Sequence, residues 1–483
     1  MPTVYFTTSQ FNENAHLSAE DNGVPSMRIV AVAADLYYRE RINKERAAPV
    51  AKAYFEEAIA KLTQPVTADE KNPSRKTESR GTIKVTGETL EAALENVNDQ
   101  FLSSQWTDGL PIVAPTPERV KWMLSGTTRS PEEEIGPVSP RNGMATVEKA
   151  AINAVMAGAK PEYLPVILAI VDALADPAFD ELHFATSTGS FNLVIGVSGP
   201  IADEIGMNSG LGLFSFGNRA NSTIGRAARM VMINLGHTWP AANDMALVGR
   251  PSAHAFPTFA ENQAQSPWTP YRLSQGYAES DSIVSISVTG GYGQMGGTKI
   301  YGGGAVALVP PENVLQSVID DIKSGRGGVR ETPNGPMSGF GSSHRKFFII
   351  FNPEIAQELN SRLGYTRESL QAYIDDQTSV AFENLHPAEI ASVERAINSG
   401  YIPADRVEAF KAGLKAGGKV PGLLRPTDAH FMVAGGIPGY TITMSSYRNG
   451  IYKPESHISK PISGATLTEA GRTSSQDNKS AKR

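Results

Sequence analysis

Two guanidinium groups and two side-chain amides gather at the start of one expected helix, in the segment FGNRANSTIGRAARMVMINLG (216–236). The free N–H groups and the dipole of a helix already place positive charge at its start, so added cations are stable there only with an anion. Guanidinium groups hold carboxylates and phosphates through paired hydrogen bonds. The alternative is that both arginines pair with acidic side chains at the surface. The pattern favours a binding site for a small anionic substrate, formed by Asn218, Arg219, Asn221 and Arg226.

Three further residues are candidates for moving protons. His344 lies in GSSHRK, directly ahead of an expected buried strand, and a histidine there suits a general acid or base. Asp108 lies at the turn of WTDGLPIV (106–113), where turn chemistry explains the glycine and the proline but not the carboxylate. Glu261 is an isolated acid in an apolar stretch, where burial would raise its pKa. For His344 and Glu261 the alternative is a purely structural hydrogen bond.

Two more polar residues are candidates for binding the substrate. Asn153 shares a helix face with Lys149 among residues that we expect to be buried, and a buried amide needs partners. It would either order an active-site loop or tie down neighbouring backbone. Thr188 lies in TSTGS (186–190), just before another expected buried strand.

The composition excludes several kinds of chemistry. The chain has no cysteine, so thiolate catalysis, disulfide exchange and cysteine-bound metal clusters are impossible. The eight histidines form no pair at helical spacing, and Asp428 with His430 on one strand is a weak metal signal. No nucleophile elbow, P-loop or dinucleotide fingerprint is present. We therefore expect neither a metal nor a cofactor.

Size and charge narrow the setting of the protein. A chain of 483 residues with 40% hydrophobic and 19% charged residues is typical of a globular protein with more than one domain. A net charge of −6 gives no attraction to nucleic acid or to an anionic membrane. Because we find no signal peptide and no apolar run long enough for a membrane helix, we expect a cytoplasmic protein. Self-association into a homo-oligomer is left open.

Apolar runs alternate with amphipathic segments along most of the chain. Strand-like runs at 193–198, 283–288, 305–310, 346–352 and 430–435 alternate with helical patterns such as 145–159, 163–175 and 311–325. This predicts an α/β fold with mixed or mostly parallel sheets covered by helices. In the arginine-bearing segment, Ser222 or Thr223 is expected to cap the helix and Gly236 to end it.

Composition shifts divide the chain into four parts. We expect a small N-terminal α/β unit (1–66), a polar linker (67–83), a main α/β catalytic body (84–455) and a polar C-terminal tail (456–483).

Two segments of the main body resemble each other. FNLVIGVSGPIADEIG (191–206) and KFFIIFNPEIAQELN (346–360) each join a buried strand to a helix that begins with proline. A duplication would give two pseudo-repeated halves; the alternative is chance recurrence of a common unit.

Three long segments carry a family resemblance: WTDGLPIVAPTPERVKWML (106–124), GMATVEKAAINAVMAGAKPEYLPVILAIVDAL (143–174) and GNRANSTIGRAARMVMINLG (217–236). They resemble proteins that are encoded beside, or fused to, the UGSC-motif selenoprotein family. GVPSMRIVAVA (23–33) resembles the C-terminal end of a UGSC protein itself, so the chain looks like a fusion. The redox motif is missing, and Ala159 stands where we expect relatives to carry cysteine.

From the residues we expect a thiol-independent enzyme that performs hydrolysis, elimination or hydration on a small anionic molecule. The resemblance implies an alternative, in which the protein is a non-catalytic subunit that presents a substrate to a UGSC-type redox partner.

Overall fold

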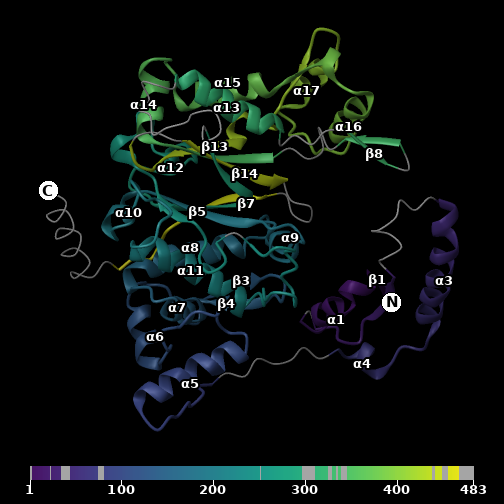
Figure 1. Cartoon of the computed structure of the whole chain (residues 1–483), viewed down its shortest axis with the longest axis vertical. Coiled ribbons are helices and arrows are strands. Elements are labelled where there is room, and N and C mark those ends of the chain that lie inside the picture. The colour runs from purple at the N-terminus through teal and green to yellow at the C-terminus, as the bar shows by residue number, and fades with distance from the viewer. Residues whose placement is uncertain are drawn as a thin grey trace.

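The computed structural model describes an α/β protein (Figure 1). The residues described are 3–21, 23–33, 44–73, 81–250, 252–295, 310–324, 329–332, 335–338, 345–437, 441–448 and 455–466.

Helices and strands alternate along these residues. The helices are α1 (Asn12–Asp21), α3 (Lys44–Thr63), α4 (Ala68–Lys71), α5 (Leu90–Ser103), α6 (Pro117–Leu124), α7 (Val147–Met156), α8 (Leu164–Leu174), α9 (Glu181–Thr186), α10 (Pro200–Glu204), α11 (Arg219–Asn234), α12 (Tyr271–Ser274), α13 (Pro311–Ser324), α14 (Pro353–Ser361), α15 (Arg367–Thr378), α16 (Pro387–Asn398) and α17 (Val407–Gly413). The strands are β1 (Val4–Thr8), β2 (Arg28–Val32), β3 (Glu134–Val138), β4 (Gly143–Thr146), β5 (Asn192–Ser198), β6 (Thr258–Ala260), β7 (Ile283–Met295), β8 (Val329–Thr332), β9 (Gly335–Ser338), β10 (Arg345–Phe351), β11 (Val380–Ala381), β12 (Lys419–Val420), β13 (Ala429–Val433), β14 (Thr441–Arg448) and β15 (His457–Pro461).

The N-terminal part is a small unit with its own sheet. Strands β1 and β2 pair in parallel, and α1 and α3 contact them. Arg28 on β2 forms an ion pair with Glu70 of α4, so a short helix occupies the start of the expected linker. Asn14 of α1 donates a hydrogen bond to the Ala242 carbonyl of the main body. The first residues are thus tied to the rest of the protein.

Within the described residues the main sheet has the order β13-β10-β14-β7-β5-β6, and β15 also pairs with β7. The pairs β5–β6 and β10–β13 are parallel, whereas β7 and β14 run antiparallel to their neighbours. The prediction of an α/β fold is confirmed, and the sheet is mixed rather than mostly parallel.

The sheet folds over so that its two halves face each other. Residues 283–289 of β7 pair with β5. On the other edge of β7, residues 283–287 pair with β15, and residues from 289 onward pair with β14. One shared core contains Val194 and Phe259 from the β5 half together with Phe348 and Met432 from the β10 half. The rings of Phe259 and Phe348 lie 5.9 Å apart. Side chains from both halves therefore form the packed core between them.

Helices cover the outer faces of both halves, as Figure 1 shows. Helices α7, α8 and α11 pack against Leu193, Ile195 and Val197 of β5 and their neighbours on β7. Helices α13, α14 and α15 pack against Ile349 of β10 and Phe431 of β13. Because side chains alternate along a strand, one face of β5 reaches the helices and the other reaches the shared core.

The end of the main body differs from its expected boundary. We expected a polar tail from residue 456, but 457–461 form β15, and Ile458 and Ile462 pack against the α7–α8 core. Side chains alternate between the two faces of a strand, so Ile458 faces the helices although its neighbours in HISKP are mostly polar. The polar composition of this segment therefore concealed a strand.

The two segments that resemble each other occupy related settings. Strands β5 and β10 each have one parallel and one antiparallel neighbour, and each is followed by a helix with proline in its first turn. A duplication predicts this arrangement, and the duplication itself stays a prediction.

Candidate functional site

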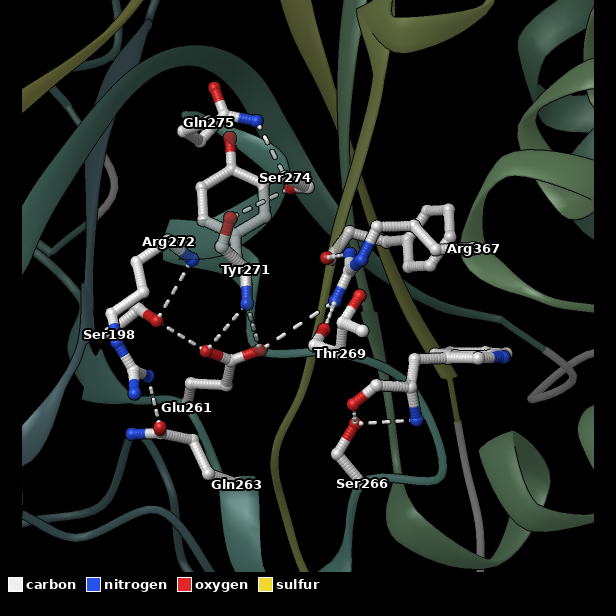
Figure 2. A network of polar contacts seen from close by, with 12 residues as sticks. Ser198, Glu261, Gln263, Ser266, Thr269, Tyr271, Arg272, Ser274, Gln275 and Arg367 are labelled. Carbon is white, nitrogen blue, oxygen red and sulfur yellow. Dashed lines mark hydrogen bonds and ion pairs between the residues drawn. The ribbon is translucent and has the colours of Figure 1, made fainter. Parts of the chain in front are cut away.

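A connected polar network lies buried at one end of the folded sheet, and its centre is Glu261 (Figure 2). Ser198 ends β5 and Glu261 follows β6, so the parallel pairing of these strands brings both side chains together. The Ser198 hydroxyl donates to Glu261 Oε2 at 2.5 Å, and the Tyr271 N–H donates to both carboxylate oxygens at 2.9 and 3.0 Å. Arg367 Nη2 lies 3.7 Å from Glu261 Oε1.

The contacts of Glu261 suit a carboxylate. Ser198 Oγ accepts the Arg272 N–H at 3.2 Å and has its own proton to donate to Glu261. The Tyr271 N–H and the Arg367 guanidinium are donors as well. Burial raises the pKa of Glu261, and the Arg367 charge opposes that effect. The Glu261 carboxylate joins the start of α12 to Arg367, and its role in proton transfer stays a prediction.

Arg367 connects the network to the half of the sheet that contains β10 and β13. Its guanidinium donates to the Phe431 carbonyl at 2.5 Å and to the Thr269 carbonyl at 2.8 Å. Burial lowers the pKa of Arg367, while Glu261 favours its charged form. A fully buried ion pair is stable only with such added hydrogen bonds, so these contacts fix where α12 lies.

Tyr271 extends this network to two histidines. Its hydroxyl lies 3.0 Å from His430 Nδ1 and 2.9 Å from His457 Nε2. The two imidazole rings are stacked, with centres 3.8 Å apart and planes at 17°. His430 comes from β13 and His457 from β15, so the cluster joins the two halves of the sheet.

Both histidines are neutral in this setting. Burial lowers the pKa of His457 to about 3, with a further contribution from the Lys346 charge. Burial, the neighbouring His457 and Lys346 together lower the pKa of His430 well below its ordinary value. Burial also raises the pKa of the Tyr271 hydroxyl, so the phenol keeps its proton at neutral pH.

The remaining nitrogens of these rings have no partner in the part of the chain that the structure describes. His430 Nε2 and His457 Nδ1 are buried and make no hydrogen bond within the described residues. The same holds for the side chains of Ser287 and Thr289 on β7 and of Asn192 on β5. Ser287 pairs with His457, and Thr289 pairs with Asn192. Since buried polar groups need partners, this face of the sheet is suited to a small polar ligand or to water.

The helix that carries the expected anion site starts earlier than the sequence suggested. Asn218, not Ser222 or Thr223, caps α11 by accepting the Asn221 N–H at 3.0 Å. The Asn221 side chain holds both backbone groups of Asn208, at 3.0 Å each. Both amides therefore fix the chain ahead of the helix.

The two predicted arginines already have partners within the protein. The Arg219 guanidinium donates to the Gly158 carbonyl at 3.0 and 2.9 Å, near the end of α7. Arg226 donates through Nε and Nη2 to the two oxygens of Asp108, both at 2.9 Å. His254 Nδ1 lies 3.8 Å from the same carboxylate.

These contacts explain the carboxylate in WTDGLPIV. The Asp108 side chain is buried and also accepts the Leu110 N–H at 3.2 Å. Burial raises its pKa, but the Arg226 charge and hydrogen bonds outweigh burial, so the pKa of Asp108 lies below its ordinary value. Asp108 thus locks the loop to α11 as a permanent anion.

Asn153 and Thr188 make their hydrogen bonds with residues outside the network of the two histidines. The Asn153 amide donates to the Lys149 carbonyl at 2.9 Å and accepts from Asn234 at 2.6 Å, which ties α7 to α11. Thr188 is exposed, and its carbonyl accepts the Leu247 N–H at 3.1 Å. His344 lies outside the described residues, and its role as a base stays a prediction.

The sequence did not single out Tyr271, His457 or Arg229 as candidate functional residues. For Tyr271 and His457, one sequence pattern indicated a polar interior. In IVSISVT (283–289) polar residues alternate within a strand that is otherwise apolar, which indicates a polar surface inside the protein. Within the described residues, no three potential ligand side chains cluster to hold a metal ion. Nor does that part of the chain contain a helix with the length and apolar character needed to cross a membrane.

No model of a known protein family matches this chain, and no curated protein matches it. The resemblance to proteins associated with the UGSC-motif family therefore stays a prediction.

Proposed function

We propose that this protein is a cytoplasmic enzyme that uses Tyr271, His430 and His457 for acid–base chemistry on a small anionic molecule. Hydrolysis, elimination and hydration all need such proton transfer, and none of them needs a thiol. The observation that carries the proposal is the Tyr271 hydroxyl between two stacked, neutral histidines whose outer nitrogens have no partner within the described residues.

The number of protons in this cluster supports the role. The Tyr271 hydroxyl has one proton and can donate it to only one of the two rings. When the other ring donates its N–H to the phenol oxygen, one outer nitrogen carries a proton and the other carries a lone pair, whichever ring accepts the phenol proton. The cluster therefore offers one acid and one base at the same time.

A relay of protons through the phenol exchanges these two roles. When the outer nitrogen of one ring takes a proton from the substrate, the inner N–H of that ring passes its proton to the phenol oxygen. The phenol proton passes to the other ring, and the outer proton of that ring passes to the substrate. Each ring then has its other tautomer, and the outer acid and base have changed places. An enzyme that takes a proton at one position of a substrate and returns it at another needs this property.

The charges near the rings favour an anionic substrate. Lys346 lowers the pKa of both histidines, and Arg367 lowers that of His430. Lys346 and Arg367 each have an acidic partner, Glu455 and Glu261. The effect of the two cations on the pKa values of the rings supports an anionic substrate, because a carboxylate at the rings would be attracted by the same charges.

A deuterium-exchange assay tests the proposal. Purified protein is incubated in D₂O with a panel of small hydroxy, keto and unsaturated acids, and proton NMR follows exchange or turnover. Tyr271→Phe keeps the ring and removes the hydroxyl, and it should lower the rate by about 10²- to 10⁴-fold. Tyr277→Phe is the matched control, because Tyr277 lies against the same core and its hydroxyl bonds a backbone carbonyl. A full rate in Tyr271→Phe would contradict the proposal.

The alternative, a non-catalytic subunit of a UGSC-type redox system, has one observation in its favour. The WTDGLPIV segment and α6 expose large apolar side chains, with Trp106 at 41% and Trp122 at 52% exposed. Exposed apolar surface of this kind is a common feature of docking sites. Turnover in the same assay only after a thiol-bearing UGSC protein is added would support this alternative.

A further inference from the structure

Arg229 is a buried arginine with two guanidinium nitrogens that have no hydrogen-bonding partner among the described residues. It lies in α11, it is 5% exposed, and its Nε and Nη2 atoms have no partner in the part of the chain that the structure describes. Its guanidinium carbon lies 4.2 Å from the centre of the Phe256 ring, so an aromatic ring covers one flat face. A buried charge without a counter-ion strongly destabilises a protein.

The charges around Arg229 do not balance. Arg250 is paired with Asp244 at 2.7 Å, and Arg226, one turn before Arg229, is paired with Asp108 at 2.9 Å. Three guanidinium groups therefore share two carboxylates. Burial and next the Arg250 charge lower the pKa of Arg229 to about 10, so Arg229 is still charged at neutral pH. One negative charge is missing from this group.

The free atoms of Arg229 are those that a carboxylate would use. On the same helix, Arg226 holds both oxygens of Asp108 through its own Nε and Nη2 atoms. This edge of a guanidinium presents two parallel N–H groups, which match the two oxygens of a carboxylate. Arg229 presents the same edge without an acidic side chain on it.

We infer that the Nε–Nη2 edge of Arg229 is a binding site for the carboxylate of a small organic acid. Asp244, Arg250 and Phe256 lie near it and belong to the segment between α11 and β6, whose described part contains no helix or strand; Asp108, which also acts on it, is already paired with Arg226. Such a segment can adjust to admit a ligand at lower cost than a helix or a strand can.

This site is separate from the histidine cluster. Helix α11 packs on the outer face of the sheet, whereas Tyr271 lies in the shared core between its two halves. Binding at Arg229 can therefore be measured without any turnover, and either proposal can fail alone.

Acetate is the probe for the test. The full chain is heated in rising sodium acetate, with chloride holding the ionic strength constant. We expect the melting temperature to rise with the logarithm of acetate concentration above saturation, and saturation-transfer NMR to show contact with the acetate methyl group. Arg229→Met removes the charge and keeps an apolar chain over Phe256, so both responses should disappear.

Two further variants make the outcome decisive. Arg219→Met removes the exposed arginine of the same helix, which bonds the Gly158 carbonyl, and it should keep the acetate response. Should Arg229→Met fail to fold, Arg229→Lys keeps the charge without the planar edge and should weaken acetate binding at least about tenfold. An unchanged response in Arg229→Met, a response lost only in Arg219→Met, or no response in the wild-type protein would overturn the inference.

Discussion

Tyr271 links two buried groups that are far apart in the sequence. Its backbone N–H donates to the Glu261 carboxylate, and its hydroxyl forms hydrogen bonds with His430 and His457. The Glu261–Arg367 pair sets the position of α12, and this position brings the phenol to the rings. A pair of oppositely charged side chains therefore positions the cluster of Tyr271, His430 and His457.

Little of this cluster could be predicted from the sequence. Glu261 was a candidate because an acid within an apolar run is conspicuous locally. Tyr271 contacts two histidines that lie 159 and 186 residues further along the chain. No local sequence spacing could therefore predict these contacts. His430 drew attention only beside Asp428, whose buried carboxyl makes no metal cluster within the described residues.

The buried histidines predict a specific loss of stability in acid. His457 is neutral in the folded protein down to a pKa of about 3, whereas an unfolded histidine takes up a proton near 6.5. Below that pH only the unfolded state gains the proton, so stability falls as the pH drops from 6.5 towards 3. At pH 5 the loss is about 2 kcal/mol for His457.

Urea unfolding at pH 7 and pH 5 measures this loss. His457→Gln should reduce the difference between the two pH values by about that amount, because glutamine does not titrate. His16→Gln, at an exposed position of α1, is the control and should leave the difference unchanged. An identical pH dependence in wild type and His457→Gln would mean that His457 is not held neutral.

At the scale of elements, α11 is joined to three neighbouring segments by polar contacts. It ties the loop at Gly158 through Arg219, the WTDGLPIV loop through Arg226, and α7 through Asn234. Its existence and its apolar face could be read from the sequence. Its start could not, since Asn218, Ser222 and Thr223 are all suitable caps and only packing selects among them.

A glycine in this helix tests how closely it packs. A β-carbon at Gly225 would lie 2.2 Å from the Phe256 carbonyl oxygen. Helix propensity alone favours Gly225→Ala by about 1 kcal/mol, but overpacking costs about 1 to 3 kcal/mol. We therefore expect net destabilisation in urea unfolding. Ser222→Ala, on the exposed side of α11, should be neutral or mildly stabilising. Stabilisation by Gly225→Ala would show that the helix stands further from β6.

At the scale of the whole molecule, β7 belongs to both halves of the sheet. It pairs with β5 and β15 near its start and with β14 near its end. The class of fold could be predicted from alternating patterns, but this pairing could not. Sequence periodicity predicts which face of a strand is buried, but it does not predict which strand pairs with it. The strand β15 was missed for the same reason.

This architecture predicts that the two halves unfold together. Separating them would expose the shared core and would leave Glu261 and Arg367 as unpaired buried charges, so a state with only one half folded is strongly disfavoured.

Because the chain has no cysteine, a single label can be placed at will. Ser222→Cys on α11 and Ser361→Cys on α14 put a fluorophore on the two outer layers. Their urea midpoints should coincide, with one steep transition that reflects the surface exposed by the whole body. Two separate midpoints would mean that the halves are independent domains and that the contacts across the shared core contribute little to stability.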